Sequence, residues 1–273
     1  MRGHILLAVG LCACGGPTRH GPGGDQSDAA VAPDSTGNGG GDGSVIEQVY
    51  VYAHTASTLY RVDPDTLAIN QVGNFGWPSG SDQMTDLAID QTGLMIGVSF
   101  SSVYRVDPTT AQATLLSSNL GGTFNGLSFV PAAMLGQTGA DVLVGTRNSD
   151  GKVFRVDPMT GATSEVGDMG AYASSGDLVS IANFGTVQTV TGGSSDVLAK
   201  LAPNTFAAMP VGSGTGFGEI WGIAYWKNKV YGFTSNGDFV LIDPSTGVAT
   251  LVSHQNGLSW WGAAVTTLAP VIQ

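Results

Sequence analysis

The feature that most constrains this chain is an internal repeat that occurs five times after residue 45. Its clearest copy reads Leu-Tyr-Arg-Val-Asp-Pro-Asp-Thr, at residues 59–66. Further copies, of which the fourth is degenerate, occupy residues 103–110, 153–160, 198–205 and 239–246. The fifth positions of these copies, residues 63, 107, 157, 202 and 243, are 44, 50, 45 and 41 residues apart. A period in this range indicates one supersecondary unit per repeat, stacked against its neighbours.

The segments between the copies have the pattern of short β-strands joined by tight turns. Ahead of the second copy, residues 85–90 form an apolar stretch, residues 91–93 predict a turn, and residues 94–99 predict the next strand. Most copies contain Asp-Pro-x-Thr, which we interpret as a structural turn because Asp accepts backbone N–H bonds and Pro restricts φ. Another short strand follows. Four strands in roughly 40 to 50 residues are typical of one blade of a β-propeller.

The two ends of the repeat region decide the number of blades. Residues 47–73 predict only three strands of a blade. The missing inner strand is predicted at residues 261–265, Trp-Gly-Ala-Ala-Val, which align with residues 221–225 and 125–129. A C-terminal strand that completes the N-terminal blade closes the ring and leaves no free sheet edge. We therefore predict an all-β fold, a five-bladed β-propeller over residues 45–273. The alternative is an open stack of sheets, in which that strand would have no partner.

The first residues have the pattern of a bacterial targeting segment. A weakly positive start precedes the apolar run 5–13, which is too short to span a bilayer. Residues 11–15, Leu-Cys-Ala-Cys-Gly, resemble the lipobox of bacterial lipoproteins, with Cys14 as the lipidated residue because a small Ala precedes it. A disulfide between Cys12 and Cys14 is the alternative, but cysteines this close hardly bridge each other. The resemblance implies a signal peptide over residues 1–13 and a lipid on Cys14.

Residues 14–44 are interpreted as a tether between that lipid and the repeat domain. They are rich in Gly, Asp, Ser and Pro and contain almost no large apolar side chain. Such a segment cannot offset the entropy of ordering, so we predict that it is disordered. The predicted location is the bacterial cell envelope, at the outer membrane or the cell surface.

The composition narrows the choice of partners. The 41 glycines and 11% charged residues suit many short strands and tight turns. A net charge of −11, with only ten Lys and Arg, argues against a nucleic-acid partner, since such binding requires clustered basic residues. We expect a monomer attached to the membrane through its lipid, with a glycan, a small molecule or a protein as its ligand.

The blades also resemble a known group of proteins. Residues 86–94, Asp-Leu-Ala-Ile-Asp-Gln-Thr-Gly-Leu, and residues 104–110, Tyr-Arg-Val-Asp-Pro-Thr-Thr, resemble blades of bacterial secreted propellers of the NHL and YVTN type. The likeness covers nearly all of residues 45–269, although Ala202 replaces the usual Asp in the fourth copy. It implies the fold but no particular function, because such propellers bind, scaffold and occasionally catalyse.

Positions at which the blades differ predict the ligand site. Aligning the inner strands places small residues in one row: Ala88, Ser128, Ser180, Ala224 and Ala264. Three positions earlier, one residue from each blade is expected to ring a mouth of the central channel, with Glu219 and Trp260 nearby: Thr85, Asn125, Asp177, Trp221 and Trp261. Two indoles, an amide and a carboxylate suit a sugar or a small polar ligand, because aromatic faces stack on sugar rings while polar groups fix orientation. The alternative is that the two Trp side chains only fill space between blades.

No catalytic motif accompanies this predicted site. His-Glu-x-x-His, Gly-x-Ser-x-Gly, phosphate-loop and EF-hand spacings do not occur in the sequence. Two of the four histidines precede residue 45, which leaves too few for a histidine-rich metal site. We therefore expect a non-catalytic binding module without metal or cofactor. The alternative is a saccharide or lactone hydrolase that uses Asp177 and Glu219 as carboxylates at the channel rim.

Overall fold

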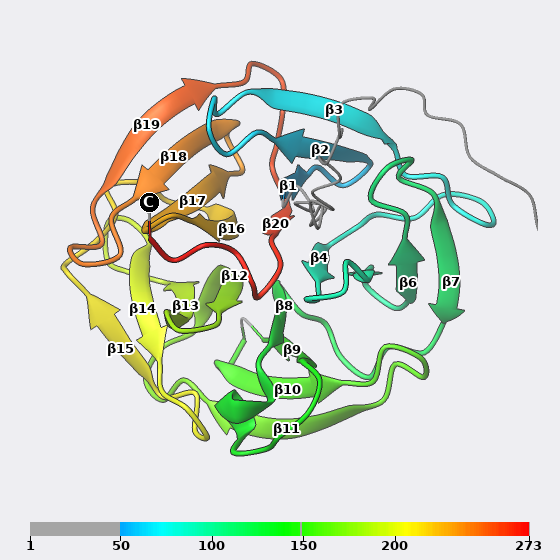
Figure 1. The fold of residues 1–273 in the computed structure, drawn as a ribbon, viewed down its shortest axis with the longest axis horizontal. Coiled ribbons are helices and arrows are strands. Elements are labelled where there is room, and N and C mark those ends of the chain that lie inside the picture. The colour runs from blue at the N-terminus through cyan, green and yellow to red at the C-terminus, as the bar shows by residue number, and fades with distance from the viewer. Residues whose placement is uncertain (1–49, 148, 273) are drawn as a thin grey trace, which may run out of the picture. The chain divides into compact units, whose positions relative to one another are not determined.

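The computed structural model describes residues 50–147 and 149–272, which form five four-stranded antiparallel sheets around a common axis (Figure 1). This arrangement confirms the five-bladed β-propeller. The segments predicted to be signal peptide and tether, with Cys14, lie outside the described residues.

Each blade consists of four strands, which follow one another from the channel outward. Blade 1 contains β20 (Gly262–Ala264), β1 (Val51–His54), β2 (Thr58–Val62) and β3 (Ile69–Asn74). Blade 2 contains β4 (Asp86–Ile89), β5 (Met95–Val98), β6 (Val103–Val106) and β7 (Ala113–Ser117). Blade 3 contains β8 (Gly126–Val130), β9 (Val142–Thr146), β10 (Lys152–Val156) and β11 (Thr163–Asp168), with a 3-10 helix at Ala132–Leu135 after β8. Blade 4 contains β12 (Ser174–Ile181), β13 (Gly185–Val190), β14 (Val197–Leu201) and β15 (Ala208–Val211). Blade 5 contains β16 (Ile220–Trp226), β17 (Lys229–Thr234), β18 (Asp238–Ile242) and β19 (Ala249–His254).

Blade 1 closes the ring with strands from both ends of the propeller. The C-terminal β20 pairs antiparallel with β1, so that Gly262 lies opposite His54 and Ala264 lies opposite Tyr52. Just before β20, the N–H of Trp261 donates to the carbonyl of His54 at 2.8 Å. The exchange gives the inner edge of β1 a partner, as the sequence predicted, and the open stack of sheets is wrong.

The repeated Asp-Pro-x-Thr segment forms the turn between the third and fourth strands of a blade. In blade 1, Asp63 Oδ1 accepts the N–H groups of Asp65 at 3.0 Å and Thr66 at 2.8 Å. These bonds to the ionised form lower the pKa of the Asp63 carboxyl. The equivalent carboxylates make the same bonds in three other blades: Asp107, Asp157 and Asp243. The repeated aspartates therefore have the structural role that the sequence indicated.

The core lies between the faces of neighbouring blades. All four residues of β4 and of β5 are buried, whereas most of the outer β7 is not. Trp260 shows how two blades are joined, because its indole is fully buried and contacts Tyr60 of blade 1 and Phe233 of blade 5, with ring centroids 5.1 and 5.5 Å away. Trp260 is a core side chain and not part of the channel mouth.

Candidate functional site

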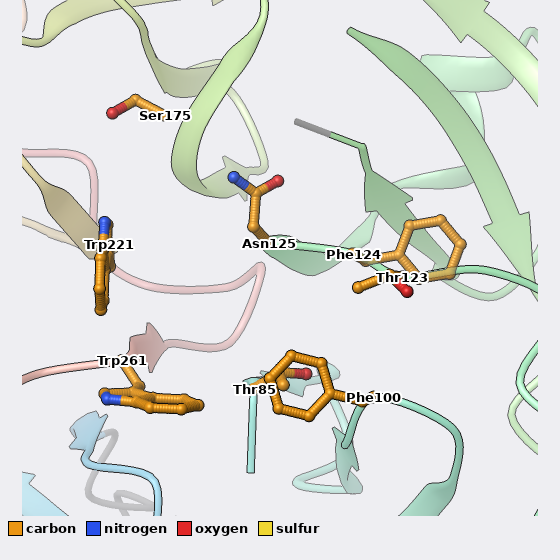
Figure 2. Close-up of a pocket in the computed structure, with 8 residues that line it drawn as sticks. All are labelled: Thr85, Phe100, Thr123, Phe124, Asn125, Ser175, Trp221 and Trp261. Atoms are coloured by element: carbon orange, nitrogen blue, oxygen red, sulfur yellow. The ribbon is translucent and has the colours of Figure 1, made fainter. Parts of the chain in front are cut away.

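A cavity of about 290 Å³ opens where the inner strands of several blades begin. We call it the mouth pocket and define it by its lining residues (Figure 2): Thr85, Phe100, Thr123, Phe124, Asn125, Ser175, Trp221 and Trp261. Four of these, Thr85, Asn125, Trp221 and Trp261, belong to the ring of five predicted from the sequence. Each of these four residues lies directly before the first regularly paired residue of an inner strand. The inner strands therefore bring side chains from four blades to one place.

Aromatic rings form the main apolar walls of the mouth pocket. The indoles of Trp221 and Trp261 lie with their centroids 6.3 Å apart and their planes at 88°. Phe100, in the loop between β5 and β6, stands at 77° to Trp261 with centroids 6.4 Å apart, and its side chain is 54% exposed. Figure 2 shows both indoles with a face turned toward the cavity. The walls therefore offer aromatic faces in two perpendicular directions.

The polar side chains of the pocket are mostly engaged with the protein. The Thr85 hydroxyl donates to the carbonyl of Val98 at 3.0 Å, and the Ser175 hydroxyl donates to Asp196 Oδ1 at 2.6 Å. The Asn125 amide nitrogen donates to the carbonyl of Ser174 at 3.3 Å, while its Oδ1 is buried without a hydrogen-bond partner. This oxygen is also closed off from solvent, so Asn125 lines the pocket without offering Oδ1 to a ligand.

Phe100, Thr123, Phe124 and Ser175 were not predicted from the sequence. Thr123 and Phe124 directly precede Asn125, so extending the predicted row backward along the chain would have found them. Phe100 lies in a loop outside the repeat alignment, and no sequence signal relates it to the indole of Trp261.

Asp177 was expected in the ring around the mouth, and the structure corrects this. Tyr104 in blade 2 and Ala199 in blade 4 occupy the same position of the repeat. The residues paired with them across the sheet lead inward to Leu87 in blade 2 and to Leu178 in blade 4, which are therefore equivalent. Asp177 stands directly before Leu178, one position further along the strand than the alignment assumed. The alignment matched Ala88 with Ser180, whereas the strand pairing matches Ala88 with Val179.

The fully buried Asp177 side chain binds backbone N–H groups of three blades. Its Oδ1 accepts from Leu178 at 2.6 Å and from Leu127 of blade 3 at 3.4 Å, while its Oδ2 accepts from Ile223 of blade 5 at 3.1 Å. The inner strands turn one edge to the channel, so their N–H groups need partners that no fifth strand supplies. Asp177 therefore acts as a structural link across the axis.

Asp86 is the counterpart of Asp177 in blade 2, and the two carboxyl groups interact inside the channel. The equivalent positions of the other blades are Gly126, Gly222 and Gly262. A Cβ at Gly262 would come within 2.3 Å of Asp86 Oδ1, so the glycine leaves room for the carboxyl group. Burial raises the pKa of Asp86, and burial followed by the like charge of Asp86 raises that of Asp177. The carboxyl groups of Asp86 and Asp177 therefore hold a proton more tightly than exposed carboxyl groups do.

His54 joins Asp86 and Asp177 in a buried cluster inside the channel. The sequence did not indicate His54 as a site residue. Its Nδ1 lies 3.0 Å from the carbonyl of Thr55, which places the proton on Nδ1, and its Nε2 faces Asp86 Oδ1 at 3.7 Å. Burial lowers the pKa of His54 to about 4. The contact therefore joins a neutral imidazole to a carboxyl group that favours its neutral form and is not an ion pair. Val98 and Thr146 occupy the equivalent strand position in blades 2 and 3.

Glu219, the other predicted carboxylate, is exposed and does not line the mouth pocket. Its backbone has a φ of 53°, in the left-handed region, and its carboxylate accepts a hydrogen bond from the Ser235 hydroxyl. Asp177 is enclosed among backbone N–H groups, so these two acids do not flank the pocket as a catalytic pair would. The geometry proposed for the hydrolase alternative is therefore wrong.

Neither a cluster of metal ligands nor a membrane-spanning helix occurs in the described part of the chain. Within residues 50–147 and 149–272, no group of three His, Cys, Asp or Glu side chains is arranged to hold a metal ion. The same residues contain no helix with the length and apolar character needed to cross a membrane.

Comparisons with known proteins support the fold alone. No protein-family model matches the chain, and no curated protein matches it. Among solved structures, a chain from a nidogen/laminin complex aligns over 80% of this chain and 98% of its own, with a TM-score of 0.54 and 9% identity. A chain from work on the de novo evolutionary emergence of a symmetrical protein aligns over 83% of this chain and 100% of its own, with a TM-score of 0.54 and 17% identity. At these identities the likeness carries no information on ligands.

Proposed function

We propose that this protein is a lipid-anchored binding module of the bacterial cell envelope, and that its propeller binds a small ligand in the mouth pocket. The ligand is a sugar ring or another small polar molecule. One observation carries the proposal: two perpendicular indoles and the Asn125 side chain meet in one cavity at the channel mouth. Apolar walls with a few placed polar groups are typical of small-ligand sites.

The size of the pocket supports a ligand of one ring or less. A volume of about 290 Å³ lies at the lower end of the range for small-molecule sites. Among the residues that the structure describes, no charged side chain lines the pocket, so the orientation of a ligand would depend on Asn125 and on the aromatic faces.

The site is tested by titrating the full chain with neutral sugars and small polar compounds while following tryptophan fluorescence. Trp221→Ala and Trp261→Ala are each expected to abolish the response to any compound that binds. Trp226→Ala is the matched control, because Trp226 lies on the same strand as Trp221 and is not part of the pocket. Binding that survives both pocket substitutions would refute the site.

The anchor rests on the lipobox resemblance around Cys14, and the surface or envelope location follows from it. Cys14→Ala is expected to abolish fatty-acid labelling in a bacterial host and to release the protein from the membrane fraction. Labelling that persists in this variant would refute the anchor without touching the ligand site. The NHL and YVTN resemblance supports the fold of such a secreted module and leaves its ligand open.

A further inference from the structure

We infer that the mouth pocket recognises a quaternary ammonium group, such as the trimethylammonium head of choline. This inference rests on the proposed function and narrows its ligand to one chemical class. Cations bind over the faces of aromatic rings through attraction to the ring quadrupole, and Trp is the strongest of these partners. The structure carries the inference on three grounds: the geometry of the rings, the use of the polar groups and the charge around the pocket.

The two indoles have the geometry of two walls around a single cation. If a cation sits about 4.5 Å above the centres of two perpendicular rings, those centres lie about 6.4 Å apart. Trp221 and Trp261 are 6.3 Å apart at 88°. Phe100 and Trp261 are 6.4 Å apart at 77°. In Figure 2 the indole planes of Trp221 and Trp261 form a corner that opens toward Asn125.

The polar groups of the pocket suit a ligand that needs few hydrogen bonds. The hydroxyl hydrogens of Thr85 and Ser175 and one N–H of the Asn125 amide are already used within the protein, which leaves the Thr123 hydroxyl as the main free polar group among the described lining residues. A sugar carries several hydroxyl groups, and burying them without partners would cost much of the stacking energy. A trimethylammonium group has no N–H or O–H to satisfy. A hydroxyl group attached to such a head can exchange one hydrogen bond with the Thr123 hydroxyl at the pocket wall.

The charge around the pocket favours a cation. No Lys or Arg side chain lines it, and the carboxyl group of Asp196 lies directly behind Ser175, 2.6 Å from its hydroxyl oxygen. Glu219 is close enough to Asp196 to raise the pKa of that carboxyl, after the larger effect of burial. The whole chain has a net charge of −11, which attracts cations at long range and repels anions.

The decisive comparison uses the unmodified full chain and three kinds of ligand. Choline and tetramethylammonium are titrated by calorimetry against 3,3-dimethylbutan-1-ol, which has the shape of choline with carbon in place of the charged nitrogen, and against neutral sugars. Choline is expected to bind at least about tenfold more tightly than the neutral alcohol, since only the charged head is attracted to the ring quadrupoles of the two indoles. Potassium chloride at equal ionic strength controls for unspecific salt effects.

Four variants separate the parts of the inference. Trp261→Phe keeps a ring face and is expected to weaken choline binding less than Trp261→Ala does. Thr123→Val is expected to weaken the binding of choline but not of tetramethylammonium, which has no hydroxyl group to bond with the Thr123 hydroxyl. Trp226→Ala is expected to change neither.

Each result decides between this inference and the proposed function. Equal affinity for choline and the neutral alcohol would overturn recognition of the charge while leaving the pocket as an apolar site. Binding of a sugar without binding of choline or tetramethylammonium would overturn the inference and support the proposed function. No response to any compound in the set would overturn both.

Discussion

The buried His54 makes a prediction about acid stability that can be worked out from the structure. Its pKa lies at about 4 in the folded protein, against 6.5 for an unperturbed histidine. Because the folded pKa lies below the unfolded one, the contribution of His54 to stability is present above pH 6.5 and is lost as the pH falls toward 4. A difference of about 2.5 pKa units corresponds to roughly 3 kcal/mol lost by pH 4.

The test compares the wild-type protein with His54→Asn by denaturant unfolding at pH 7.5, 6, 5 and 4 and constant ionic strength. The Asn amide can still donate to the carbonyl of Thr55, while nothing remains to titrate at this position. Groups that do not contact His54 shift stability equally in both proteins, so the wild type is expected to lose about 3 kcal/mol more than the variant between pH 7.5 and 4. Parallel pH profiles, or an imidazole NMR signal assigned to His54 that titrates near 6.5, would refute the buried neutral histidine.

Three further predictions concern the channel and the core. Because the pKa values of the coupled pair Asp86 and Asp177 are raised, their stabilising contribution is present at low pH and is lost as the pH rises through the folded pKa. Asp86→Asn should therefore lose less stability than the wild type between pH 5 and 9, and equal losses in denaturant unfolding would contradict the coupling. Gly262→Ala places a Cβ 2.3 Å from Asp86 Oδ1 and 2.4 Å from His54 Nε2, and should cost about 1–3 kcal/mol in unfolding free energy. Trp260→Ala removes a fully buried indole and should cost about 3–5 kcal/mol in thermal unfolding; a loss below about 1 kcal/mol would show that this indole is not a core contact.

The blade pattern could be predicted because its signals are local. An Asp-Pro-x-Thr turn specifies its own backbone through hydrogen bonds within four residues, as Asp63 shows with Asp65 and Thr66. The repetition of this turn every 40 to 50 residues therefore identifies each blade. The blade at the N-terminal end lacks one strand, and the extra strand at the C-terminal end is identified as its partner. Four of the five predicted ring residues line one pocket for the same reason, since equivalent positions of stacked repeats come to equivalent places.

The errors occurred where the answer depends on pairing between strands. The sequence alignment matched Ala88 with Ser180, but the strand pairing matches Ala88 with Val179, and this difference of one residue places Asp177 in the channel and not at the mouth. Glu219 was placed by its nearness to Trp221 in sequence, but its left-handed backbone lies where the chain turns out to solvent. His54 was overlooked because a single histidine has no motif, and only the ring brings it to Asp86.

The sequence by itself determined the repeat, the turn chemistry, the number of blades and the closing strand, because these follow from local propensity and from counting. Only the tertiary structure decided which side chains meet at the axis: the aromatic corner with Phe100 and the buried cluster of His54, Asp86 and Asp177. The physical reason is that register and burial are properties of the assembled ring. A difference of one residue in register decides whether a side chain such as Asp177 lines the pocket or is buried in the channel. Burial then shifts the pKa of that side chain.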